Sequence, residues 1–311
     1  MKKDPSTNRA MVIGNRQAME VLAERDKALK IRAAVLRKHS AVSKKLPSTV
    51  SPKLLAAVGG PEHNGVLVAE GDSWFDYPGP DILSLLERNY GYEVEDVASP
   101  GDRIQDMAYN EGQLEKFTRK IEKVIRGGNM PKAILLSGGG NDVAGKEFAV
   151  LLNHASAPKP GLNIPLVKEI VEERIKDAYV TIISAVTQVC KKRLGQRIPI
   201  LLHGYDYAVP DGRGYLWFGP WLEPGFREKG YQNMNQRIAM VQDLIDRLNN
   251  MLLGVSKISD FKHVSHVDFR TTLPNDSTYK KWWDNELHPT DRGFELVAKK
   301  FANAVEAADT P

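Results

Sequence analysis

Five short segments that suit β-strands alternate with helix-like segments over most of the chain, and this alternation restricts the fold more than any other feature. Each is apolar or alternates between apolar and polar residues, which is typical of strands. The five segments are 66–69, 93–98, 133–136, 198–203 and 263–269. Strands that alternate with helices form parallel sheets, because a parallel connection needs a crossover. The sequence therefore predicts an α/β fold, with right-handed crossovers and a parallel five-stranded sheet that helices cover on both faces.

The segments between the strands contain the expected helices and two stretches that fit neither element. Prolines near helix starts and glycines after helix ends mark several boundaries. The expected helices are 81–89, 111–127, 165–194, 231–253 and 289–308. The stretches near 143–165 and 205–230 are insertions that follow strands at the carboxyl edge of the sheet. Since α/β sheets bind ligands at that edge, we expect both insertions to shape a substrate site.

Residues 1–60 form a basic extension ahead of a domain that covers 61–311. The extension carries a net charge of +9, and the rest of the chain carries −5. A helix is expected over 10–39, followed by a linker with Pro47, Pro52 and Pro61. One interpretation is a helix that packs on the body or on a second subunit. The alternative is a basic amphipathic helix that contacts an anionic membrane or partner.

Composition indicates an ordinary globular protein, with 42% hydrophobic residues and no run of 18 apolar residues. The N-terminal stretch has charges where a signal peptide needs an apolar region, so a cytoplasmic location is expected. Cys190 is the single cysteine. It therefore cannot form an internal disulfide, and we interpret it as a small core residue.

Ser73 is the candidate nucleophile, in the stretch VLVAEGDSWFDYP at 66–78. It follows the first buried strand at once, where parallel sheets place reactive groups. The tripeptide Gly-Asp-Ser also suits an ordinary turn. It is not a nucleophile elbow of the G-x-S-x-G type, because Phe75 occupies the last glycine position.

Three later stretches complete a set with Ser73. Gly101 follows Ser-Pro, Asn141 follows three glycines, and His288 lies in DNELHP. Ser, Gly, Asn and His in this order resemble the SGNH (GDSL-type) hydrolase family, over about 66–304. The resemblance implies a flavodoxin-like three-layer α/β/α architecture with strand order 2-1-3-4-5. It also implies a serine hydrolase that cleaves carboxylic esters through an acyl-serine, with no cofactor.

The resemblance implies one role for each of these residues. His288 would take the proton from Ser73, because a hydroxyl is a poor nucleophile until a base removes its proton. The backbone N–H groups of Ser73 and Gly101 and the side-chain amide of Asn141 would bind the oxyanion of the tetrahedral intermediate.

The sequence departs from the family where the third triad residue is expected. The family has an aspartate three residues before the histidine, and here that residue is Asn285, with Asp284 one place earlier. We expect Asp284 to orient His288, because an anion best stabilises an imidazolium. Asn285 or a backbone carbonyl could do so instead, which would leave a Ser–His dyad.

Two other classes of site receive little support. The pattern G-x-x-x-x-G-K at 140–146 resembles a phosphate loop, but Glu147 stands where Ser or Thr must bind magnesium. Nucleic acid is not an expected partner, and no metal site is expected, since the i, i+3 pair His263 and His266 would lie on opposite faces of a strand.

The substrate stays open among simple esters, lysophospholipids, thioesters and O-acetylated sugars. Three of the five tryptophans flank the site motifs and two lie in the second insertion, which suggests an aromatic pocket or lid. An esterase or lysophospholipase-like lipase is the main expectation. The alternatives are a carbohydrate O-acetyl esterase of the same fold and an inactive ligand-binding module.

Overall fold

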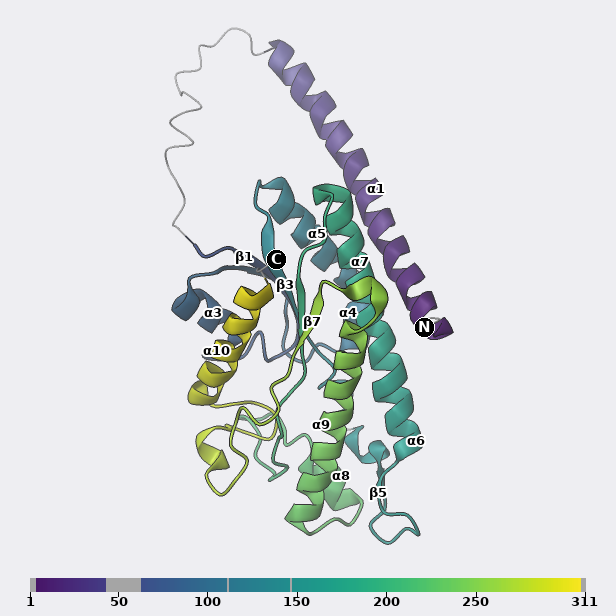
Figure 1. Ribbon diagram of the computed structural model, residues 1–311, viewed down its shortest axis with the longest axis vertical. Coiled ribbons are helices and arrows are strands. Elements are labelled where there is room, and N and C mark those ends of the chain that lie inside the picture. Colours follow the sequence, from purple (N-terminus) through teal and green to yellow (C-terminus); the bar gives the residue numbers. More distant parts are fainter. Residues whose placement is uncertain (1–3, 43–62, 111, 146, 309–311) are drawn as a thin grey trace.

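The computed structural model describes residues 4–42, 63–110, 112–145 and 147–308. Its centre is a parallel sheet of five strands in the order β2-β1-β3-β6-β7 (Figure 1). The strands are β1 (Val66–Glu70), β2 (Glu93–Asp96), β3 (Pro131–Ser137), β6 (Ile200–His203) and β7 (Val264–Val267). Counted by position along the chain, this is the order 2-1-3-4-5, so the predicted topology is confirmed.

The sheet is most deeply buried at its centre. Every residue of β1 and β6 is buried, as expected for strands covered on both faces. β1 pairs with β2 on one side and β3 on the other, with Leu67 opposite Val94 and Ala133. β2 is an edge strand without a fully buried residue. Because the strands are parallel, the carboxyl ends of the adjacent strands β1, β3 and β6 lie at the same edge of the sheet.

Helices cover both faces of the sheet. α3 and α10 pack together on one face, and α4, α5, α7 and α9 lie on the other (Figure 1). The helices are α3 (Ile82–Tyr90), α4 (Ile104–Tyr109), α5 (Gln113–Arg126), α6 (Ile164–Val167), α7 (Lys176–Leu194), α8 (Glu223–Glu228), α9 (Met234–Ser256) and α10 (Asp291–Ala308). The protein thus has the expected three-layer architecture.

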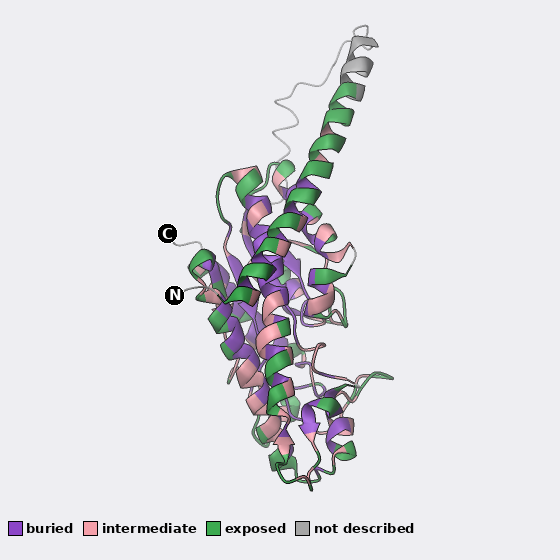
Figure 2. Ribbon diagram, turned by 90° about the vertical axis from the view of Figure 1, so that its right-hand side faces the viewer, coloured by how far each residue is buried: buried purple, intermediate pink, exposed green. Residues whose placement is uncertain are grey.

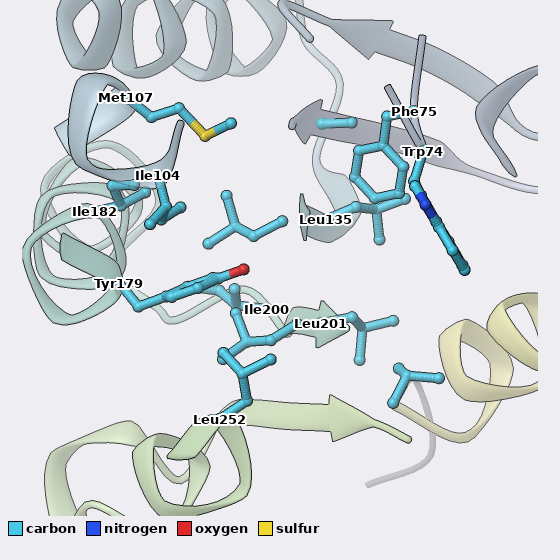
Figure 3. Packing of buried hydrophobic residues seen from close by; sticks show 14 of the residues in the cluster. Trp74, Phe75, Ile104, Met107, Leu135, Tyr179, Ile182, Ile200, Leu201 and Leu252 are labelled. Atoms are coloured by element: carbon cyan, nitrogen blue, oxygen red, sulfur yellow. The ribbon is translucent and has the colours of Figure 1, made fainter. Parts of the chain in front are cut away.

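Side chains from the strands and both helical layers form one continuous core. Figure 3 shows Tyr179 of α7 and Leu252 of α9 against Ile200 and Leu201 of β6, with Trp74 and Phe75 close by. Trp74 and Phe75 follow Ser73 directly, so the segment that carries Ser73 is anchored by two buried rings. Cys190 is buried in the same core, as expected.

The N-terminal helix α1 (Pro5–Val42) packs along α7 through its N-terminal part, and its C-terminal part projects from the body (Figure 1). A Cβ at Gly14 would lie 2.1 Å from the carbonyl oxygen of Thr181, so this close contact requires glycine. Ala18 and Leu22 are buried, whereas residues 31–34 are exposed, as is the projecting part of the helix in Figure 2. The helix therefore packs on the body, which was one of the two interpretations. The expected linker with Pro47, Pro52 and Pro61 lies outside the described residues, and the division at residue 60 stays a prediction.

Several short elements depart from the sequence prediction. The helix expected over 165–194 is three segments, because a wide π-helical stretch (Lys168–Ile175) separates α6 from α7. α4 and α8 have six residues each and show too few turns for a helical period. The first insertion contains a 3₁₀ turn (Phe148–Leu151) and a small hairpin of β4 (Leu152–Asn153) and β5 (Gly161–Leu162). α5 begins at Gln113, whereas the sequence predicts a start at residue 111. Residue 111 itself lies outside the described residues.

Candidate active site

Ser73 lies in a turn that starts immediately after β1 and is held by the buried carboxylate of Asp72. One oxygen of Asp72 accepts hydrogen bonds from the backbone N–H of Trp74 at 3.0 Å and from the Ser137 hydroxyl at 2.8 Å. The other oxygen accepts from the Tyr205 hydroxyl. Burial raises the pKa of Asp72, and these three donors favour its charged form. The sequence analysis missed this role of Asp72, although the residue is part of the Gly-Asp-Ser motif.

The hydroxyl of Ser73 meets the imidazole of His288. Ser73 Oγ lies 2.7 Å from His288 Nε2, which is hydrogen-bond distance for proton transfer. The indole N–H of Trp74 donates to the carbonyl of Leu287 at 3.0 Å, so the two segments are also joined beside this contact. His288 is only 6% exposed, and burial lowers its pKa to about 3. The imidazole is therefore neutral at ordinary pH and can accept a proton.

Asn285, and not Asp284, contacts the second nitrogen of His288. The amide oxygen of Asn285 lies 3.0 Å from His288 Nδ1 and accepts the backbone N–H groups of Leu287 and His288, each at 3.0 Å. Its NH₂ donates to the hydroxyl of Tyr77 at 3.0 Å and to the carboxylate of Asp284 at 3.2 Å. These partners fix the amide with its oxygen toward the imidazole, so Nδ1 carries the proton and the lone pair of Nε2 faces Ser73.

The expectation that Asp284 contacts His288 is wrong. Asp284 is exposed, and its carboxylate accepts the Tyr77 hydroxyl at 3.0 Å. The turn that precedes α10 is closed by the backbone N–H of Asp284, which donates to the carbonyl of His288 at 2.9 Å. Inside this closed turn the side chain at position 285 reaches the imidazole, and the side chain at 284 does not.

Tyr77 is a site residue that the sequence analysis missed. Its ring stacks on the imidazole of His288, with centroids 4.4 Å apart and an interplanar angle of 23°. Its hydroxyl joins Asn285 to Asp284, as described above. No motif surrounds Tyr77, so only its position four residues after Ser73 could have drawn attention to it.

Asn141 lies beside Ser73, on a loop tied to the loop of Gly101. The amide nitrogen of Asn141 donates to the carbonyl of Asp102 at 3.0 Å. The backbone N–H of Ser99 donates to the carbonyl of Gly71 at 3.0 Å. The 99–102 loop is therefore hydrogen-bonded both to the loop that carries Ser73 and to the loop that carries Asn141. Gly101 is exposed with φ +86°, a left-handed conformation that suits glycine. The structure brings Ser73, His288 and Asn141 to one cavity, and Gly101 is not among the residues that line it.

The cavity beside Ser73 has a volume of about 60 Å³ and is mainly apolar. A single water needs roughly 10–15 Å³ measured in the same way, so the cavity holds more than one water or a short chain. Its polar lining consists of the side chains of Asp72, Ser73, Asn141, Tyr205, Asp206 and His288. Its apolar walls come from the loop after β3, the π-helical stretch, the second insertion, α9 and the segments that carry Ser73 and His288: Trp74, Val143, Ala144, Val171, Ala208, Leu222, Val241, Leu244, Ile245, Leu248, Trp283 and Leu287.

Glu286 fastens the second insertion to the segment that carries His288. Its carboxylate is fully buried and accepts four backbone N–H groups at 2.7–3.0 Å, from Gly212, Trp221, Leu222 and Glu223. Burial raises its pKa, and the four donors favour the charged form. The sequence analysis missed this residue, because its partners are backbone groups more than 60 positions away.

The five tryptophans divide into four kinds. Trp282 is half-buried, and the Arg292 guanidinium lies over its ring, 5.2 Å from the centroid. Trp74 and Trp283 are buried and line the cavity, in agreement with an aromatic pocket. Trp221 packs edge-on against His288 with centroids 5.7 Å apart. Trp217 is 90% exposed and lies outside the cavity lining.

Neither a metal cluster nor a membrane-spanning helix is found among the described residues. In that part of the chain, no group of three or more His, Cys, Asp or Glu side chains could hold a metal ion. No helix there is both long enough and apolar enough to cross a bilayer. Lys146, which would complete the phosphate-loop pattern, lies outside the described residues.

A family model described as GDSL-like lipase/acylhydrolase matches residues 67–301. This range covers most of the chain and contains Ser73, Gly101, Asn141 and His288. No curated protein matches the sequence.

Several solved structures resemble the chain at low sequence identity. A protein described as a GDSL-like lipase from Parabacteroides merdae is 15% identical with a TM-score of 0.44, over 79% of this chain and 97% of the other. A catalytic mutant of an acetylxylan esterase from Geobacillus stearothermophilus is 14% identical with a TM-score of 0.42, over 78% and 94%. A protein described as an SGNH hydrolase from Slackia heliotrinireducens is 13% identical with a TM-score of 0.44, over 77% and 97%.

Proposed function

This chain belongs to the GDSL-like lipase/acylhydrolase family, and on that premise we propose that Ser73 and His288 carry out its ester hydrolysis through an acyl-serine. One observation carries the proposal: Ser73 Oγ lies 2.7 Å from His288 Nε2, and both side chains line a mainly apolar cavity. Family membership makes the chain a carboxylic ester hydrolase, and the residue roles and the acyl group are what we add.

The first half of the reaction needs a base and an attacking oxygen. His288 Nε2 takes the hydroxyl proton while Ser73 Oγ bonds to the ester carbonyl carbon. The imidazolium then gives its proton to the leaving alkoxide as the C–O bond breaks, which leaves an acyl-serine. In the second half water replaces the alcohol, and the same proton transfers return Ser73 as a free hydroxyl. The Asn285 oxygen holds the Nδ1 proton of His288 throughout.

The oxyanion would be bound by donors on three adjacent loops. One N–H of the Asn141 amide is directed to the carbonyl of Asp102, and the second N–H is available to the developing oxyanion. The backbone N–H groups of Ser73 and Gly101 complete the set. Each donor of this kind typically contributes about 2.7–4 kcal/mol to transition-state stabilisation.

The mainly apolar cavity supports a short aliphatic acyl group as the acid half of the substrate. Val241 and Leu248 of α9 add to its apolar lining, and the polar lining side chains Asp72, Tyr205 and Asp206 are already engaged in hydrogen bonds of the fold. An O-acetylated sugar could place only its acetyl group in this cavity, so most of the wall would stay unused. We therefore favour an esterase for short acyl chains over a carbohydrate O-acetyl esterase.

A series of p-nitrophenyl esters of rising acyl length tests this proposal. We expect kcat/KM to rise from acetate by up to about fourfold per methylene, since each buried CH₂ contributes roughly 0.8 kcal/mol, and then to fall once the cavity is full. Val241→Phe should move the optimum toward acetate, and Val12→Phe, on the exposed face of α1, should not. Faster hydrolysis of acetylated oligosaccharides than of any aliphatic ester would contradict the proposed acyl group.

A further inference from the structure

Three consecutive large apolar side chains stand in solvent at the tip of a tight hairpin in the second insertion. Leu216, Trp217 and Phe218 are 75%, 90% and 66% exposed. Tyr215 and Phe218 exchange both backbone hydrogen bonds at 2.8 Å, so Leu216 and Trp217 occupy the two corners of the turn. Such corners normally hold glycine or asparagine, and Leu216 adopts φ +50°, which leucine rarely does. Both the backbone and the exposed surface are unfavourable for a free loop, which points to a functional contact.

The base of this hairpin is firmly held. Glu286 accepts the N–H of Gly212 at one end of the hairpin segment and that of Trp221 at the other, at 3.0 and 2.7 Å. The guanidinium of Arg213 donates to the carbonyls of Trp283 and Asp284 at 2.8 and 2.7 Å. The apolar tip is thus mounted on the segment that carries His288, and its position relative to the site is fixed.

The hairpin also lies at the rim of the site. The ring of Tyr215 is 5.4 Å from the ring of Tyr77, which stacks on His288. Trp221, on the other arm, packs against His288 itself. Anything that binds the tip is therefore brought close to the mouth of the apolar cavity.

We propose that this hairpin inserts Leu216, Trp217 and Phe218 into a lipid surface and so presents the cavity to esters in that surface. Its catalytic consequence rests on the proposed function, and the docking itself does not. Tryptophan suits the boundary between headgroups and acyl chains, because its ring is apolar and its N–H is polar. Leucine and phenylalanine supply apolar area that a fluid acyl layer can cover without a shaped partner.

A protein partner fits the tip less well than a lipid surface does. Stable protein interfaces use roughly 20–30 residues on each side, whereas this apolar tip consists of three residues. The groove beside Tyr215 contains Lys281 and Arg292 together with Asp284 and Asp291. Since neither sign of charge dominates, the attraction should be apolar and should not require anionic lipid.

The basic helix α1 is poorly placed for the same role. Its projecting end lies at the opposite end of the molecule from α8 and β5, which belong to the insertions around the site (Figure 1). A membrane contact through that end would direct the site away from the lipid. The hairpin contact directs the site toward it.

Co-sedimentation of the full chain with phosphatidylcholine vesicles tests the docking. We expect the wild type to bind, and Leu216→Ser/Trp217→Ser/Phe218→Ser to lower the partition coefficient at least tenfold. Val12→Ser/Ile31→Ser/Val150→Ser removes three exposed apolar side chains elsewhere and should bind as the wild type does. Binding should persist in about 1 M NaCl, where charges are screened beyond roughly 3 Å.

Two further measurements separate this proposal from the proposed function. The hairpin variant should hydrolyse soluble p-nitrophenyl butyrate at the wild-type rate, which also shows that it is folded, and Ser73→Ala should still bind vesicles. Full turnover by Ser73→Ala would overturn the catalytic assignment and leave the docking intact. The docking is overturned if the wild type does not bind, if the hairpin variant binds equally well, or if binding needs anionic lipid and disappears in salt.

Discussion

At the residue scale, a neutral amide orients the imidazole of His288 in the place where serine hydrolases commonly use a carboxylate. Replacing a triad aspartate by asparagine in trypsin lowers kcat about 10⁴-fold, because the amide favours the wrong tautomer. Asn285 avoids that problem, since two backbone N–H groups hold its oxygen toward Nδ1. The imidazolium gains less stabilisation from an amide than from an anion, and burial lowers the pKa of His288.

Asn285→Ala should therefore lower kcat at least about 10²-fold, as expected when an orienting group is lost. Asp284→Ala should cost less than tenfold, because this exposed carboxylate hydrogen-bonds to Tyr77 and to the NH₂ of Asn285 and not to the imidazole. Steady-state kinetics of both variants with a soluble ester measure the difference. A larger loss for Asp284→Ala would mean that the carboxylate, through Tyr77, is the group that matters.

The pH profile gives an independent check of the same contact. Since burial lowers the pKa of His288 to about 3, the base stays unprotonated and kcat/KM should not fall until the pH is below about 5. Asn285→Asp would place a carboxylate beside Nδ1 and favour imidazolium, so its acid limb should move upward, toward the ordinary histidine value of roughly 6.5. Equal acid limbs in the two proteins would contradict the assigned contact.

At the element scale, the site depends on segments far apart in sequence that meet at the carboxyl edge of the sheet. Ser73 after β1, Asn141 after β3 and His288 before α10 occupy the places that their motifs predict. Sequence spacing could not show whether Asp284 or Asn285 faces the imidazole, because both lie in an irregular turn. It also could not reveal Glu286, whose partners are backbone groups of a distant loop, or α4, which is too short to show a period.

Glu286→Gln should loosen the second insertion. A glutamine NH₂ cannot accept hydrogen bonds, so at least two of the four N–H groups lose their acceptor, and hydrogen bonds to charged groups contribute roughly 1.5–3 kcal/mol each. We expect a Tm lower by several degrees and a reduced kcat/KM, measured by calorimetry and ester hydrolysis. Glu295→Gln, an exposed change on α10, should alter neither quantity. Unchanged Tm in Glu286→Gln would show that the insertion is held by other contacts.

At the scale of the whole molecule, the topology of the sheet was predictable, whereas the places of α1 and of the hairpin around Trp217 were not. The alternation of strands and helices predicted a parallel sheet covered on both faces, and the family resemblance implied the strand order. The projection of α1 (Figure 2) and the position of the hairpin around Trp217 beside the site depend on tertiary packing that no local pattern encodes. Both are exposed features, where burial imposes no periodicity on the sequence.

The central claim is that Ser73 is the nucleophile of an ester hydrolase, and stoichiometric labelling tests it most directly. A p-nitrophenyl alkylphosphonate should release one equivalent of nitrophenol, abolish ester hydrolysis and add its phosphonyl group to the peptide that contains Ser73, as read by mass spectrometry. Ser73→Ala should take no label and show no turnover, although Ser99 and Ser137 remain nearby. Label on another residue, or full ester hydrolysis by Ser73→Ala, would contradict the account.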